Sequence, residues 1–307
     1  MNFDTVFLAV VLNSTIRLTT PILFVALGSA FCNRVFIFNI GLEGMMLAGA
    51  FSAIVANFYT KSVALSIFSA MIASMLVAWL AGIFMVKLNG AMLVVGVSIN
   101  TLMSGLTTFL MQLIFGIKGA FVSSDLVSLP KIDVSCLRGS PFLYTLFDSL
   151  TWLDLFAFVL AFVLNFVLFR TVAGFHMRSV GINKDAANSL GINGDRIQIL
   201  TIIFSGALSG LGGVLLTMGG VTLFAQNITA GRGYIAMASA SLGAAHPIGT
   251  IVSSAFFGLA QSLANFLQNS SISSELTMAI PYAATIFALM AYNSFRLRSP
   301  QRQSEPK

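Results

Sequence analysis

The sequence is poor in charged residues. Only 8% of its 307 residues are charged, with 16 Lys or Arg and 10 Asp or Glu, whereas a soluble domain carries about 25%. So few charges cannot cover the surface of a soluble protein of this size. Hydrophobic residues make up 57% of the chain. This composition excludes a soluble enzyme, a disordered chain and a nucleic-acid binder, and it predicts a polytopic membrane protein embedded in a lipid bilayer.

The residues and motifs that form several common functional sites are also missing. No Gly is followed by Lys, so the phosphate-binding Walker A motif is absent. The two cysteines, Cys32 and Cys136, are predicted to lie on opposite faces of the membrane, and His176 and His246 stand alone in loops, so neither a disulfide nor a metal site is expected. We therefore expect a chain that is not an enzyme and holds no metal or cofactor. Any ATP would have to be bound by another chain.

Long apolar runs dominate the rest of the sequence. About 20 apolar residues are needed for a helix to cross a bilayer, and these runs are continuous rather than alternating, which favours helices over strands. The predicted spans are residues 5–31, 38–58, 63–86, 91–115, 152–169, 197–218, 233–245, 248–267 and 276–292. The span at 233–245 is short. The first stretch is either one crossing or an exterior helix followed by a crossing from 15 to 31. The prediction is an all-α membrane bundle of about eight or nine helices, some short or broken.

The basic residues give an orientation. If the N-terminus lies outside, ten of the sixteen basic residues fall in cytoplasmic segments and five in outer ones, with Arg17 inside a span. Cytoplasmic loops of membrane proteins are enriched in Lys and Arg. We therefore expect the N-terminus outside and the C-terminus inside the cytoplasmic (inner) membrane. A transmembrane domain would cover residues 1–293, followed by a basic cytoplasmic tail at 294–307.

Two loops are long enough to serve as docking surfaces. Residues 116–151 form an extracytoplasmic loop, and its length suggests a binding surface rather than a connector. Residues 170–196 are cytoplasmic and contain a predicted helix at 184–190, with Asn183 as N-cap, Asp185 in the first turn and Gly191 after its end. A helix of two turns is marginal by itself. It therefore needs the membrane domain or a partner to pack on.

Glu43 lies near the start of a long apolar run, in the string NIGLEGM at 39–45. Two interpretations remain open. Glu43 is solvated at the cytoplasmic interface near a helix N-terminus, or it lies inside the bundle and pairs with Arg17, the other ionisable group at membrane depth. The second interpretation would also suit an ion-coupled transporter in which Glu43 is the coupling carboxylate.

Two roles are open for the other polar residues inside the spans, and small residues occur there as well. Asn100, Gln261 and Asn265 either join helices or line a wet pathway, so with Glu43 they are our candidates for a substrate path. Small residues at 205–213 have spacing suited to close helix packing. The string GRGYIA at 231–236 fits a dinucleotide-binding pattern, but no strand precedes it, so its glycines are expected to form a backbone turn.

Several strings together resemble one family. Residues 20–28 and 39–45 are similar to the N-terminal signature of bacterial ABC importer permeases of the ribose/branched-chain amino acid class, and NIGLEGM is closest to the nucleoside-uptake branch. Residues 180–193 resemble the cytoplasmic coupling segment of that class, except that Ile182 replaces the usual polar or acidic residue. Residues 231–236 and 246–250 resemble its C-terminal signature. The similarity runs from about residue 19 to residue 293.

The resemblance implies a transport subunit that works with several partners. These are an ABC ATPase subunit that binds ATP and Mg²⁺, a second permease subunit, expected to be a paralogue, and an extracytoplasmic substrate-binding lipoprotein. The substrate would be a nucleoside, with ribose or another simple sugar as the alternative; an ion-coupled secondary transporter is the alternative of another class. The residues expected to couple to the ATPase are Gly181, Asn183, Lys184, Asp185, Ala186, Ala187 and Gly191.

Overall fold

The computed structural model describes residues 3–135 and 140–268, together with residue 290. Within these residues, seven helices are long and apolar enough to cross a membrane. They are α1 (Phe3–Arg34), α2 (Leu42–Thr60), α3 (Val63–Gly82, continued by a π-helical turn at Ile83–Lys87), α4 (Met92–Phe115), α6 (Trp152–Arg170), α9 (Gly194–Met218) and α11 (Pro247–Gln268). The predicted helical bundle is confirmed. The predicted span at 276–292, the tail at 294–307 and Cys136 lie outside the described residues.

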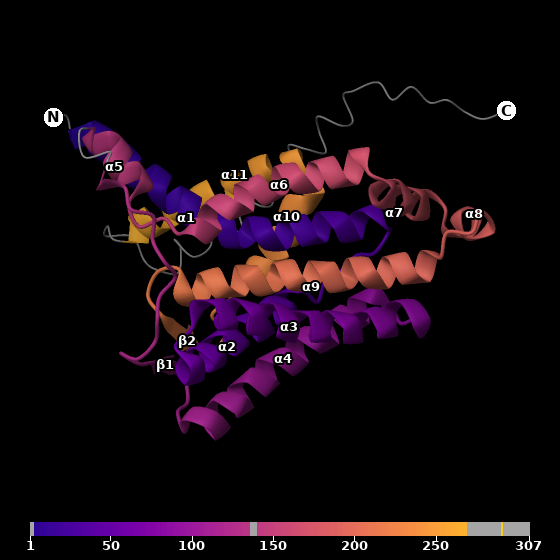
Figure 1. The fold of residues 1–307 in the computed structure, drawn as a ribbon, viewed down its shortest axis with the longest axis horizontal. Coiled ribbons are helices and arrows are strands. Elements are labelled where there is room, and N and C mark those ends of the chain that lie inside the picture. Colours follow the sequence, from indigo (N-terminus) through magenta and orange to yellow (C-terminus); the bar gives the residue numbers. More distant parts are fainter. Residues whose placement is uncertain (1–2, 136–139, 269–289, 291–307) are drawn as a thin grey trace.

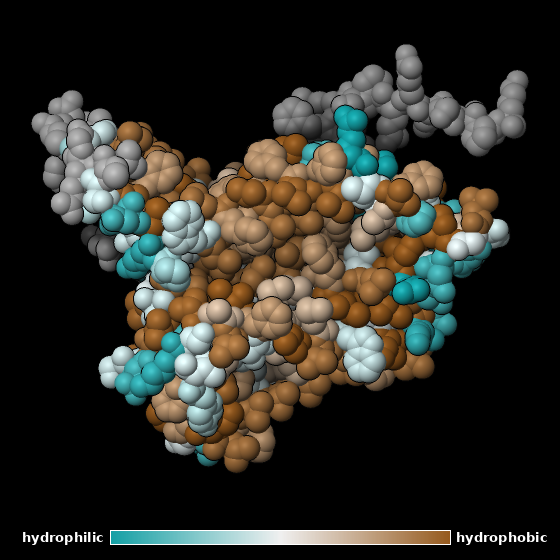
Figure 2. Space-filling model, in the orientation of Figure 1, coloured by the Kyte–Doolittle hydropathy of each residue, from teal (hydrophilic) through white to brown (hydrophobic). Residues whose placement is uncertain are grey.

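The long helices lie side by side and separate two ends of the molecule (Figure 1). One end carries α5 (Pro141–Phe147) and a short antiparallel sheet, whereas the other carries α7 (Val172–Ile182) and α8 (Lys184–Ser189). Figure 2 shows a broad hydrophobic band between hydrophilic residues at the two ends. This distribution is expected for helices whose middle parts face lipid.

The small residues of α9 allow it to lie in the centre of the bundle. α9 packs against α1, α2 and α3. A Cβ atom at Gly210 would lie 2.7 Å from the carbonyl oxygen of Ala70 in α3, and one at Gly213 would lie 2.5 Å from that of Met46 in α2. Glycine at these positions therefore permits backbones to approach closely, as the spacing of small residues predicts.

The first segment is one continuous helix, without a break near residue 15. α1 runs from Phe3 to Arg34 with Pro21 inside it. Proline cannot donate to the carbonyl four residues earlier, which is that of Arg17, and the Thr20 hydroxyl approaches this oxygen at 3.4 Å. Near the start of α1, Asn13 donates to the carbonyls of Leu146 and Asp148 and holds α5 in place.

The predicted outer loop contains elements that the sequence pattern does not reveal. β1 (Ala120–Val122) pairs antiparallel with β2 (Leu223–Ala225), far away in sequence. Three-residue strands are too short for an alternating pattern to identify. After β2 the chain forms α10 (Arg232–Leu242), which corresponds to the predicted short helix at 233–245.

Candidate functional site

Glu43 binds the N-terminus of α10. Its Oε1 accepts a hydrogen bond from the backbone N–H of Gly231 at 2.8 Å, and its Oε2 accepts one from Gly233 at 2.6 Å. The side chain is buried, with 7% exposed, and it forms no salt bridge among the described residues. A carboxylate is favoured at this position because the helix N-terminus carries partial positive charge. The expected place of Glu43 near a helix N-terminus is confirmed, but Glu43 is neither solvated nor paired with Arg17.

The glycines of the GRGYIA string make this contact possible. Gly231 has a φ of 80°, a left-handed conformation that glycine adopts at low cost. A Cβ atom at Gly233 would lie 2.6 Å from Cα of Glu43. The string is therefore a turn that brings α10 against α2, as expected, and not a dinucleotide site.

The opposite end of α10 is held by Arg34. Its Nε donates to the carbonyl of Ala245 at 2.8 Å and its Nη2 donates to that of Ala244 at 3.2 Å. α10 thus has an acid at its N-terminus and a base beyond its C-terminus, which complements its dipole at both ends. With 11 residues, α10 is about 16 Å long. Glu43 and Arg34 are therefore separated by about the length of α10.

Asn100 connects α4 to the same place. Its Nδ2 donates to the carbonyl of Ile40 at 3.0 Å and to the hydroxyl of Tyr234 at 2.9 Å, while its Oδ1 accepts from the N–H of Gly44 at 2.8 Å. The start of α2, the start of α10 and Asn100 together form what we call the helix junction. Transporters commonly bind substrate where interrupted helices meet inside the membrane.

The helix junction borders an exposed face of α4. A groove on this face is lined by Val97, Ser98, Thr101, Leu102, Gly105, Leu106 and Phe109. Ser98, Thr101 and Gly105 follow one another at helical spacing and are all exposed. This face thus offers small and polar groups beside lipid-facing apolar residues, as a partly wet surface would.

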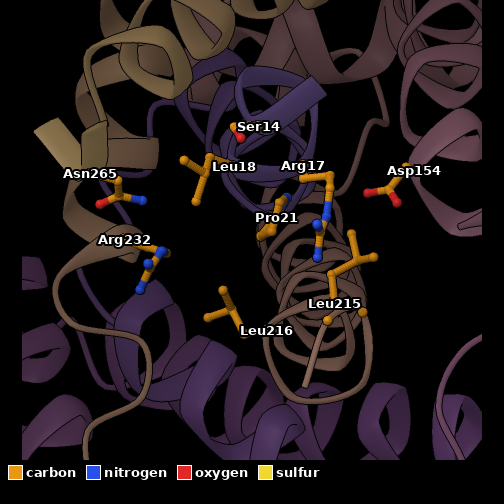
Figure 3. A pocket seen from close by; sticks show the side chains of 11 residues that line it. Ser14, Arg17, Leu18, Pro21, Asp154, Leu215, Leu216, Arg232 and Asn265 are labelled. Carbon is orange, nitrogen blue, oxygen red and sulfur yellow. The ribbon is translucent and has the colours of Figure 1, made fainter. Parts of the chain in front are cut away.

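A separate cavity of about 290 Å³ lies between α1, α6, α9, α10 and α11. Arg17 and Arg232 lie on opposite sides of it, and Asn265 lies next to Arg232 (Figure 3). Asp154 also lines the cavity, but its carboxylate accepts hydrogen bonds from the backbone and hydroxyl of Thr151 and from the Thr20 hydroxyl. The candidate path residues are therefore divided: Glu43 and Asn100 meet at the helix junction, while Asn265 faces this other cavity.

Gln261 lies on α11 like Asn265, away from the helix junction. Its Oε1 is buried and has no hydrogen-bond partner within the described part of the chain.

The sequence pattern did not indicate three residues that the structure adds as functional candidates: Asp154, Arg232 and Tyr234. Each follows a turn or cap at the beginning of a helix, and nothing in the local pattern indicates which other helix that end contacts.

Replacing Arg17 by Gln is expected to have little effect on folding. Arg17 is exposed and forms no ion pair among the described residues, so no buried partner loses its counter-charge. We expect the melting temperature of the detergent-solubilised protein to stay within about 2 °C of the wild-type value. A loss comparable to that of a Glu43 variant, rescued by exchanging the two charges, would instead indicate the Arg17–Glu43 pair that the structure excludes.

The segment at 180–193, which resembles a coupling segment, contains the capped helix that the sequence predicts. The Asn183 side chain accepts a hydrogen bond from the N–H of Ala186 at 3.0 Å, and Gly191 has a φ of 83°. Lys184 forms an ion pair with Asp195 at 2.5 Å. Ala187 is buried and Ala186 is exposed. The helix α7 (Val172–Ile182), which overlaps the start of this segment, was not predicted.

Gly181, which belongs to this segment, also allows two helices to pack closely. A Cβ atom there would collide with the carbonyl oxygen of Arg34, so glycine allows α7 to lie directly against the end of α1. Two apolar side chains on either side of α8 face outward: Ile182 is 87% exposed and Leu190 is 81% exposed. We call these two exposed side chains together the α8 surface.

Sequence comparison identifies relatives along nearly the whole chain. Residues 11–289 match the model of the family described as "Branched-chain amino acid transport system / permease component". The chain is 32% identical to the guanosine ABC transporter permease protein NupQ of Bacillus subtilis, with 93% of this chain and 92% of that protein covered. It is also 32% identical to the nucleoside ABC transporter permease protein NupC of Lactococcus lactis, with the same coverage.

A more distant relative and a solved structure extend the comparison. A Haloferax volcanii protein provisionally named a glucose ABC transporter permease, TsgC13, is 27% identical, with 92% of this chain and 85% of that protein covered. The solved structure of an inward-facing ABC transporter, provisionally called metal-chelate type, has a TM-score of 0.51 at 18% identity and covers 95% of this chain and 89% of that one. This second likeness concerns the fold alone.

Proposed function

Because this chain belongs to the branched-chain amino acid transport system / permease component family, we propose that it carries nucleosides through the membrane as one subunit of an ATP-driven importer. It is a multi-pass membrane permease and not an enzyme. The names of its relatives from Bacillus subtilis and Lactococcus lactis support nucleosides as the substrate class. ATP and Mg²⁺ are bound by a partner ATPase.

The α8 surface is the observation that supports docking of a partner ATPase. It combines a short capped helix with two exposed apolar side chains, Ile182 and Leu190, at the end of the bundle opposite α5. Exposed apolar side chains at a hydrophilic end of a membrane protein favour a protein partner. The ATPase docks here and moves α7 and α8 as a unit, and the contact of Gly181 with Arg34 passes this movement to α1.

The substrate path follows the exposed face of α4. A second permease subunit covers this face, so that the groove at Ser98, Thr101 and Gly105 becomes part of a passage between two chains. The outer segment 116–151 receives a substrate-binding lipoprotein. The α8 end faces the cytoplasm and the N-terminus faces outward, consistent with the basic residues of the coupling segment.

Uptake measurements test this proposal directly. We expect cells that express the chain with its ATPase, second permease and binding protein to accumulate labelled guanosine or uridine. Uptake should stop when ATP is depleted and persist when the ion gradient is collapsed. The opposite energy dependence would support an ion-coupled transporter. Uptake of ribose or glucose without nucleosides would favour the sugar alternative, which the name of the Haloferax volcanii relative supports.

A further inference from the structure

Tyr234 is the aromatic side chain that the helix junction leaves exposed. It stands in the first turn of α10, and 45% of it is accessible. Its hydroxyl oxygen accepts a hydrogen bond from Nδ2 of Asn100 at 2.9 Å. Because Asn100 is itself bonded to the backbone of Ile40 and Gly44, the start of α2 determines where the Tyr234 ring lies. The ring is therefore held in position at the surface.

The polar atoms of the other two side chains of the helix junction, Asn100 and Glu43, already have hydrogen-bond partners within the protein. The Asn100 amide has two N–H donors, and both are used, while its oxygen accepts from Gly44. The Glu43 oxygens each accept a backbone N–H, and the side chain is 7% exposed. Tyr234, in contrast, retains an exposed ring. Its hydroxyl hydrogen is also available, because the hydroxyl oxygen acts as an acceptor toward Asn100.

We propose that Tyr234 is a substrate-contacting residue on which the base of a nucleoside stacks, and that Asn100 positions its ring. This inference rests on the proposed nucleoside transport. Bases stack on tyrosine with little dependence on sequence, since every base has a π-face, and the free hydroxyl hydrogen can donate to an acceptor on the ligand. A free sugar lacks a π-face, so this site discriminates nucleosides from sugars.

Equilibrium binding to the assembled permease–ATPase complex in lipid nanodiscs, without binding protein, tests the inference. The probes are labelled guanosine and labelled ribose. We expect Tyr234→Ala to weaken guanosine binding about tenfold or more and to leave the weak ribose binding unchanged. Tyr234→Phe should stay within about threefold of wild type because it keeps the ring. Tyr59→Ala, which removes a ring that is 67% exposed near the end of α2, is the matched control and should bind guanosine normally.

Asn100→Leu tests the positioning role. It should weaken guanosine binding in the wild-type background but add little in the Tyr234→Ala background, because the ring that it positions is already gone. Unchanged guanosine binding by Tyr234→Ala, or no guanosine binding by the wild-type complex, would overturn the inference. Either result is compatible with normal nucleoside uptake when the binding protein is present. A failure of the inference is therefore distinguishable from a failure of the proposed function.

Discussion

Replacing Glu43 by Gln is expected to destabilise the protein strongly and to reduce uptake below about a tenth of the wild-type rate. The Glu43 carboxylate accepts the N–H groups of Gly231 and Gly233 in a buried position. Glutamine has one acceptor oxygen, so one of the two N–H groups would face the NH₂ group of the new side chain. An unpaired buried donor together with the lost charge at the helix N-terminus costs about 2–4 kcal/mol.

Thermal melting of the solubilised complex and uptake in cells measure this effect. Glu43→Asp is expected to be almost as harmful, because the shorter side chain cannot reach both N–H groups. Asp125→Asn provides a matched control: Asp125 pairs with Lys61 at 3.7 Å, but both side chains are about 60% exposed, and such pairs contribute little. If Glu43→Gln melts at the same temperature as Asp125→Asn, then the buried cap of α10 does not stabilise the fold.

Placing Asp at both positions of the α8 surface is expected to abolish coupling to the ATPase. Ile182 and Leu190 are the exposed apolar side chains on either side of α8. Truncating a hot-spot residue of an interface weakens binding by about thirtyfold or more. If Ile182 and Leu190 are such residues, the double variant Ile182→Asp/Leu190→Asp should lose the ATPase during co-purification. Uptake should fall to background, while the amount of permease in the membrane stays normal because both side chains already face solvent.

Two further variants sharpen this test. Val221→Asp changes an apolar residue that is 70% exposed in the segment between α9 and β2. Because β2 lies at the end of the bundle opposite α8 (Figure 1), this variant should retain the ATPase. Gly191→Pro should resemble the double variant, since proline cannot adopt the positive φ of 83° found there. Normal ATPase association in both Ile182→Asp/Leu190→Asp and Gly191→Pro would show that the ATPase docks elsewhere.

Local patterns explain which parts of the structure were predictable. Most of the apolar runs are long enough to require a helix in lipid, and the cap at Asn183 depends on residues three positions apart. Such features need only neighbouring residues. The close packing of α9 was also predictable, because small residues at helical spacing mark a helix face that permits contact.

The helix junction could not be predicted in the same way. The bonds of Glu43 to Gly231 and Gly233 join residues 188 and 190 positions apart, and that of Asn100 to Tyr234 joins residues 134 positions apart. A sequence shows that Glu43 is an unusual charge near a helix start, but it does not show which other helix end lies beside it. From the sequence, both solvation at the interface and pairing with Arg17, the other ionisable side chain at membrane depth, therefore remained open.

By itself, the sequence determined that this protein is a helical membrane protein with a short capped helix between two spans, because hydrophobic length and local capping are encoded within a few turns. That it is a permease followed from the resemblance of its motifs to a family. The tertiary structure alone decided what its scarce polar residues do. Glu43 and Asn100 are bound to backbone groups and build the junction, while Tyr234 remains exposed there. The physical reason is that buried hydrogen-bonding groups must find partners, and those partners come from distant helices that only folding brings together.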